Sequence, residues 1–291
     1  MNLKFKIIAA AAAVMIVLLA VPTLIFFPAY ERFTKLERLD FDPHYTVLLG
    51  YGGNSGILVS DDPDNPATLI IDTKMMDGAR ALNELVGELH QGGPIYVVNT
   101  SYHSAYAGGN ELYEGETIIA GEYPAGLWEA EHDEGSGRPT EWLKSGERRE
   151  IKIGSETVIV KNVGQAHTHA DVVVYLKKRS TLFVGGLVFH NWHPILREQS
   201  GVDTTRWNAV NFGLVREFPI RQLIPGHGAP HDGAALIFQG AYFVRIKNAL
   251  AYPDRKKRLE AVKNKYANYF SIPFTSGFDR SVDFIREELG Q

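Results

Sequence analysis

The chain has 291 residues, with 30 lysines and arginines against 34 aspartates and glutamates, and no cysteine. Hydrophobic residues make up 45% and charged residues 22%, which is typical of a globular protein and excludes intrinsic disorder. The lack of cysteine excludes disulfides, thiolate-bound zinc, iron–sulfur clusters and a thiol nucleophile, and a net charge of −4 argues against a general nucleic-acid binder.

The N-terminal segment differs from the rest of the chain. Lys4 and Lys6 precede an apolar run from Ile7 to Phe27. At about 1.5 Å per residue, such a helix spans a bilayer core of about 30 Å. No small-x-small cleavage site follows, so residues 1–30 are predicted to be an uncleaved transmembrane signal-anchor rather than a cleaved signal peptide. The lysines favour a cytoplasmic N-terminus and a periplasmic or extracellular body.

Residues 41–291 are predicted to form one domain that begins with strands. A turn over residues 61–66 is dense in Asp, Asn and Pro and separates two of them. Apolar residues recur at helical spacing from Ala79 to Leu89, which predicts an amphipathic helix before the next strand. The strands expected in this half are Tyr45–Leu49, Ser55–Ser60, Ala67–Asp72 and Ile95–Asn99.

The second half has a similar layout of strands and helices. Between the halves, Glu129–Gly146 is polar and contains glycine, so we expect a helix end and a surface loop there rather than a domain linker. The strands expected in the second half are Ile151–Ile153, Thr157–Val163, Val172–Leu176, Thr181–Val184 and Gln222–Pro225, and the helices are Thr204–Arg216 and Ala234–Leu250.

Histidines gather at or just after the ends of the predicted strands, where functional loops are usually built. Because cysteine is absent, imidazoles are the best remaining ligands for a transition metal, and three of them can form an open zinc site. The histidines in these places are His103, His167, His169, His190, His193, His227 and His231.

Five segments in order resemble the metallo-β-lactamase superfamily. Residues 99–110 read Asn-Thr-Ser-Tyr-His-Ser-Ala-Tyr-Ala-Gly-Gly-Asn and match without a gap the family motif Asn-Thr-His-x-His-x-Asp-His-x-Gly-Gly-Asn. The other segments look like the first strands, the second histidine motif, the strand that normally carries Gly-Asp, and the last histidine motif. They are residues 52–56 with 69–73, 164–176, 182–189 and 224–228.

The resemblance implies an α+β fold, a four-layer αββα sandwich, in which Asp72 supports the metal loop. His103, His167 and His227 stand at histidine positions of the family. Four other ligand positions differ, since the family has His, Asp, His and Asp where this chain has Ser101, Ala105, Tyr106 and Gly186. One metal would keep two ligands and the other only one, so the usual dinuclear zinc site is expected to be eroded.

Two functions are compatible with this pattern. In the first, the chain no longer performs dizinc hydrolysis and binds an unknown small molecule or partner through the inherited cleft. In the second, it is a divergent hydrolase with one zinc ion on the three remaining histidines, whose bound water is the nucleophile. Possible auxiliary ligands for that ion are His169, His190, His193 and Tyr106.

A third option is metal-free catalysis by Ser101 with His103 as its base. This option is weaker because no carboxylate that would orient the histidine is evident in the sequence. The pattern alone therefore leaves open whether the chain is an enzyme. It also leaves open whether the chain binds no cofactor or one zinc ion. If the backbone keeps the family geometry, restoring the four changed ligands is expected to recreate a zinc site.

Overall fold

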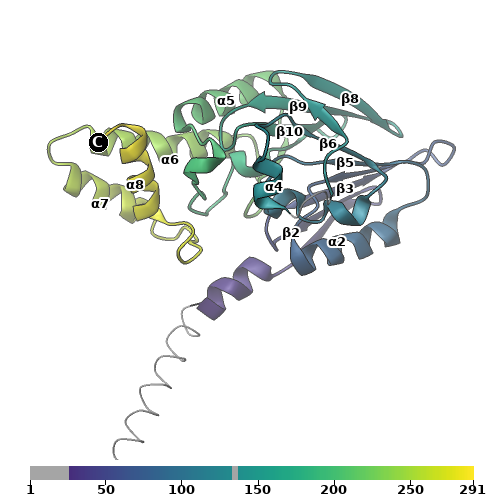
Figure 1. Ribbon diagram of the computed structural model, residues 1–291, viewed down its shortest axis with the longest axis horizontal. Coiled ribbons are helices and arrows are strands. Elements are labelled where there is room, and N and C mark those ends of the chain that lie inside the picture. Colours follow the sequence, from purple (N-terminus) through teal and green to yellow (C-terminus); the bar gives the residue numbers. More distant parts are fainter. Residues whose placement is uncertain (1–25, 133–136) are drawn as a thin grey trace, which may run out of the picture.

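The computed structural model describes residues 26–132 and 137–291. Most of the predicted membrane anchor, residues 1–25, lies outside the described residues. Within the described part of the chain, no helix is long and apolar enough to cross a membrane. Residues 26–34 are helical and lead into the body of the protein at the lower edge of the view in Figure 1.

The first sheet has seven strands in chain order. Its first four strands pair antiparallel, and its last four strands pair parallel. The strands are β1 (Glu37–Asp42), β2 (Tyr45–Leu49), β3 (Ser55–Val59), β4 (Thr68–Ile71), β5 (Ile95–Val98), β6 (Thr117–Gly121) and β7 (Glu141–Leu143).

The second sheet has five strands in the order β12-β11-β10-β9-β8. All of its pairs are antiparallel except β11 with β12, which a long helical crossover joins. The strands are β8 (Arg148–Ile153), β9 (Glu156–Gly164), β10 (Asp171–Leu176), β11 (Thr181–Phe183) and β12 (Gln222–Ile224).

Apolar side chains on both faces of the strands stack the sheets and helices in layers. In β4, Leu69 and Ile71 belong to the cluster between the two sheets, whereas Ile70 packs with helix α2 (Met76–Leu89) on the outer face. Successive strand residues point to opposite faces, which explains this alternation. The layers are helix, sheet, sheet and helix, as the sequence predicts.

The outer face of the second sheet is covered by α5 (Thr204–Glu217) and α6 (Ala234–Leu250), on the side of the molecule away from α2 (Figure 1). The carboxylate of Asp203 caps α5 by accepting hydrogen bonds from two backbone N–H groups of its first turn. The remaining helices are short α3 (Ser104–Ala107) and α4 (Leu127–Glu131), and C-terminal α7 (Arg255–Lys265) and α8 (Phe278–Glu288).

The predicted strands and the three predicted helices are confirmed to within a few residues. One prediction is wrong in part: the stretch Glu129–Gly146 contains β7, which pairs with β6. β1 and β6 were not predicted either: β1 pairs with β2 at the edge of the first sheet, and β6 lies between β5 and β7. β1 and β7 have half-exposed or exposed residues and lack an apolar run, so the sequence carries little strand signal there.

Candidate functional site

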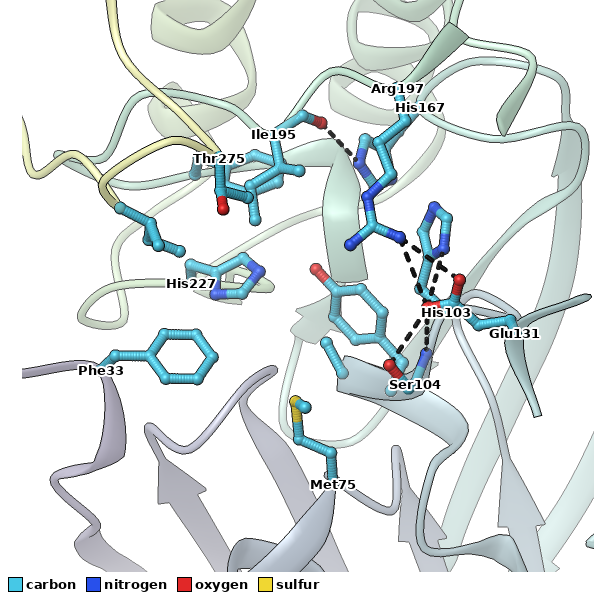
Figure 2. Close-up of a pocket in the computed structure, with 14 residues that line it drawn as sticks. Phe33, Met75, His103, Ser104, Glu131, His167, Ile195, Arg197, His227 and Thr275 are labelled. Carbon is cyan, nitrogen blue, oxygen red and sulfur yellow. Dashed lines mark hydrogen bonds and ion pairs between the residues drawn. The ribbon is translucent and has the colours of Figure 1, made fainter. Parts of the chain in front are cut away.

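A pocket of about 180 Å³ lies where loops from both halves of the chain meet. β4 and β5 are parallel neighbours, so the segments that follow them leave the sheet at the same edge. Loops after β5, β9 and β12 bring the three predicted histidines to this pocket. Figure 2 shows His103 and His167 on one side of it and His227 on the other.

Asp72 holds the loop that carries the first histidine. Its carboxylate accepts hydrogen bonds of 2.7 Å from the backbone N–H and from the hydroxyl of Thr100. The side chain is fully buried, and burial raises the pKa of Asp72 to about 8. Ser101 is buried on the same loop, and its hydroxyl accepts a bond of 3.4 Å from the backbone N–H of His103.

His103 lies at the start of α3, beside a carboxylate that the sequence analysis did not identify. Its Nδ1 is 3.6 Å from Oε1 of Glu131, which also accepts hydrogen bonds from the backbone N–H and hydroxyl of Ser104. Arg197 pairs with Glu131 at 3.3 Å. Burial raises the pKa of Glu131, but the bonds from His103 and Ser104 and the charge of Arg197 outweigh it and lower the pKa to about 2.

His167 is buried at the back of the pocket. Its Nε2 lies 3.3 Å from the carbonyl oxygen of Ile195, and its ring packs against Trp207 and Phe189 at centroid distances of 5.1 and 5.5 Å. Burial lowers the pKa of His167 well below its ordinary value, and the charges of the neighbouring imidazoles lower it further. The imidazole is therefore neutral at pH 7.

His227 is stacked between two aromatic rings on the opposite side. Phe189 lies 4.8 Å and Trp192 lies 5.2 Å from its ring centroid, both nearly parallel to it. Burial lowers the pKa of His227 to about 3, with a further contribution from the charge of Lys74. This imidazole is also neutral at pH 7.

The side chain of Tyr106 fills much of the space that separates the histidines. It is 1% exposed, and its ring lies edge-on to His227 at 5.9 Å. A Cβ atom on Gly53 would lie 2.6 Å from the Tyr106 ring, and one on Gly226 would lie 2.6 Å from its hydroxyl. The absence of side chains at these two glycines therefore makes the space that Tyr106 occupies.

The three possible auxiliary histidines do not line this pocket. His169 packs against Gly201, His190 Nδ1 bonds the carbonyl of Ala229 at 2.7 Å, and His193 Nδ1 bonds the hydroxyl of Tyr242 at 2.9 Å. Ala105 does line it, beside Tyr106. The pocket also includes Glu131, Arg197, Phe33, Ile272 and Thr275, for which the sequence offered no motif.

Zinc, which this kind of site implies, does not fit the residues as they are arranged. In residues 26–132 and 137–291, no group of three or more His, Cys, Asp or Glu side chains could hold a metal ion. Tyr106 lies against His227, and the ring of His167 occupies the space beside Gly186 where a ligating side chain would begin. The remaining chemistry of the pocket is that of three imidazoles, of which His167 and His227 are neutral at pH 7, one ion pair and apolar walls.

Solved structures with a similar fold are metallo-β-lactamases. One is a metallo-β-lactamase from Pontibacter korlensis, with a TM-score of 0.58 and 21% identity over 71% of this chain and 98% of that one. The DIM-1 metallo-β-lactamase exposed to ceftazidime gives 0.57 and 19% over 72% and 96%. VMB-1 gives 0.59 and 19% over 72% and 96%. These likenesses show that the chain has the metallo-β-lactamase fold.

No family model and no curated protein matches the sequence.

Proposed function

We propose that this chain is a membrane-anchored protein of the metallo-β-lactamase fold that binds a small, uncharged amphipathic molecule in its inherited cleft and does not perform dizinc hydrolysis. The observation that carries the proposal is that the side chains of Tyr106 and His167 take up space around the family's metal positions, yet a pocket of about 180 Å³ persists beside them. The erosion of the zinc site is thus accompanied by a cavity of different chemistry.

The electrostatics of the pocket favour a ligand without net charge. His167 and His227 are neutral at pH 7, because burial lowers the pKa of both. Glu131 and Arg197 form an ion pair with no net charge. Because Arg197 already has Glu131 as its partner, an anionic ligand would have to compete with that carboxylate for the guanidinium, and burying the ligand would cost desolvation energy. Hydrogen-bonding groups on apolar walls suit an alcohol, amide or ester with a hydrocarbon body.

The membrane anchor belongs to the same proposal. Its support is the apolar run Ile7–Phe27 after Lys4 and Lys6, which predicts a body on the periplasmic or extracellular side. Intact-mass analysis of membrane-extracted protein is expected to give the full chain. A soluble form that begins near Glu31 would contradict an uncleaved anchor.

A hydrolase with one zinc ion on His103, His167 and His227 remains the alternative. The observation in its favour is that the three imidazoles line one pocket and that the Nδ1 atoms of His167 and His227 are buried without a hydrogen-bond partner among the described residues. Elemental analysis of protein purified without added metal separates the two functions. We expect well under one equivalent of zinc. One tightly held ion that is lost in His227→Ala would support the alternative instead.

Ligand binding can be measured through tryptophan fluorescence, because Trp192 and Trp207 pack on the pocket histidines at 5.2 and 5.1 Å. The probe is an undecanol with a terminal bromine, which quenches nearby tryptophans, added to the full chain in lipid nanodiscs. Saturable quenching is expected in the native chain. It should be lost in Ile195→Phe, which fills the pocket, and retained in Val244→Phe, which adds the same ring on an exposed part of α6.

Equal, non-saturable quenching in the native chain and both variants would contradict binding in the cleft.

A further inference from the structure

Four aromatic side chains at the N-terminal edge of the body are exposed to solvent. They come from the helix of residues 26–34 and from the segment between α7 and α8. Phe26 and Phe274 stack at a centroid distance of 5.3 Å, and Tyr30 lies one helical turn beyond Phe26 and Phe27. The four, called here the aromatic patch, are Phe26 (37% exposed), Phe27 (60%), Tyr30 (60%) and Phe274 (76%).

The body of the protein holds the aromatic patch in this position. On the inner face of the helix, Ala29 and Phe33 pack against the core of the second sheet. The guanidinium of Arg32 lies 4.5 Å over the ring of Phe270, a cation–π contact. Phe274 has a φ of 62°, a left-handed conformation that is unfavourable for a bulky residue. Apart from its stacking on Phe26, the ring is left largely exposed in this conformation, which points to a further contact outside the body.

The sequence indicates what covers the aromatic patch. The apolar run Ile7–Phe27 ends inside the patch, so a bilayer that holds this run would meet the body at Phe26 and Phe27. Tyrosine is enriched at the membrane–water interface, and phenylalanine is common on the apolar face of helices that lie in that interface. Lys35, exposed just after the helix, supplies a cation that anionic head groups attract.

The aromatic patch is continuous with the mouth of the cleft. Phe33, on the same helix as Phe26 and Tyr30, lines the pocket. Ile272 and Thr275, which flank Phe274, line it as well. Figure 2 shows Phe33 and Thr275 on the same side of the pocket as His227. Whatever surface covers the aromatic patch therefore lies next to the opening of the cleft.

We propose that the aromatic patch inserts into the interface of the lipid bilayer that holds the N-terminal segment, so that the cleft opens against the membrane and takes its amphipathic ligand from the lipid phase. This inference rests on the anchor and the ligand cleft of the proposed function. It adds a defined docking face and assigns Phe274, remote in sequence from the anchor, to membrane contact.

The absence of cysteine allows a direct test with single-cysteine probes in the full chain. Phe274→Cys and Tyr30→Cys are labelled with an environment-sensitive nitrobenzoxadiazole dye and reconstituted into vesicles of phosphatidylcholine and phosphatidylglycerol. The matched control is Phe212→Cys, an exposed phenylalanine (46%) on α5, which lies at the opposite edge of the molecule from the helix of residues 26–34 in Figure 1. Spin-labelled lipids in the same vesicles quench any dye that reaches the interface.

We expect the dye at positions 274 and 30 to emit at shorter wavelength in vesicles than in detergent-free buffer, and to be quenched at least twofold more strongly by spin-labelled lipid than the dye at position 212. Equal quenching at all three positions in protein that floats with the vesicles would overturn the inference. A shift at positions 274 and 30 without lipid quenching would instead indicate contact with a second copy of the chain, and this also contradicts it.

Failure here is distinguishable from failure of the proposed function. The bromoundecanol titration reads the cleft alone, so saturable quenching together with an unquenched dye at position 274 would leave ligand binding in place and remove only the membrane docking of the patch.

Discussion

The imidazole of His167 occupies the space that a side chain at position 186 would need. A Cβ atom on Gly186 would lie 2.1 Å from Nδ1 and 2.4 Å from Cε1 of His167. The ring is enclosed by Trp207 and Phe189, so it has little room to turn away. The expectation that an aspartate at this position would help to rebuild a zinc site is not supported by this arrangement, because it would first have to displace a buried imidazole.

Gly186→Ala is therefore expected to lower the free energy of unfolding by about 1–3 kcal/mol, the usual cost of overpacking a core. In a His167→Ala background the same substitution should cost much less, since the ring it meets is gone. The matched control is Gly213→Ala in α5, where an added Cβ meets no atom within 4 Å and helix propensity predicts a gain of up to about 1 kcal/mol. Urea titrations of the four variants measure these values.

An equal cost of Gly186→Ala in both backgrounds would mean that His167 does not occupy this space.

A second prediction concerns Tyr106, because its ring and its hydroxyl contribute with opposite sign to the free energy of unfolding. The ring is fully buried, so Tyr106→Ala should lower the free energy of unfolding by about 3–5 kcal/mol through the cavity it leaves. The hydroxyl is buried without a hydrogen-bond partner among the described residues. Tyr106→Phe should therefore raise stability by roughly 1 kcal/mol, since an unpaired buried hydroxyl is unfavourable. Thermal unfolding of both variants in nanodiscs tests the pair.

A destabilised Tyr106→Phe variant would show that the hydroxyl has a partner and would weaken the idea that this side chain only fills space.

The fold could be predicted where the sequence pattern is dense. The strands around the turn at residues 61–66 and the run Val172–Leu176 are apolar, short and bounded by turn residues, and the structure confirms them. β1 was missed because it is an exposed edge strand with charged residues, and β7 because only one of its three residues is buried. β6 was missed although four of its five residues are buried. Tertiary pairing with β2 and β6 makes β1 and β7 strands, and local propensity does not encode it.

The candidate site was only partly predictable for the same reason. The motif flanks identified His103, His167 and His227, and these three do share a pocket. Glu131, at the end of α4, and Arg197, in the loop before α5, approach it from segments whose positions depend on how the layers pack, and neither belongs to a motif. The resemblance also implied that Tyr106 stands at a ligand position of the family, but not that its ring would fill the gap beside Gly53 and Gly226, which depends on how the loops pack.

His193 makes the stability of the protein sensitive to acid. It is buried, its Nδ1 bonds the hydroxyl of Tyr242, and burial lowers its pKa to about 4 although the charge of Asp279 opposes this. In the unfolded chain the pKa is about 6.5, so the unfolded state binds more protons between pH 4 and 6.5. The free energy of unfolding should therefore fall as pH drops through this window, by on the order of 1 kcal/mol at pH 5.

His193→Gln is expected to reduce this dependence by the share of one imidazole, since His167 and His227 contribute in the same direction, whereas Tyr242→Phe, which leaves the imidazole buried, should keep it. Denaturant titrations at pH 7, 6 and 5 compare the slopes. An unchanged slope in His193→Gln would assign the acid sensitivity to other groups.

The ion pair between Glu131 and Arg197 should set the charge preference of the cleft. In the native chain the two charges compensate, so the bromine-tagged undecanol should bind more tightly than the matching undecanoate. Glu131→Gln keeps a hydrogen-bond acceptor near Ser104 but leaves the guanidinium of Arg197 without its carboxylate partner. This substitution should raise the affinity for undecanoate roughly fivefold to tenfold, because one partly exposed charge contributes about 1 kcal/mol. Arg197→Gln removes the guanidinium beside the carboxylate, which keeps its contacts with Ser104 and His103, and should weaken undecanoate binding further. The double variant Glu131→Gln, Arg197→Gln removes both charges and should return the preference for the alcohol.

Tryptophan quenching measured at two salt concentrations checks the electrostatic origin, because the change in Glu131→Gln should shrink at high salt. If all four forms of the chain bind the acid and the alcohol in the same ratio, the ion pair does not face the ligand and the assignment of this pocket as the binding site is wrong.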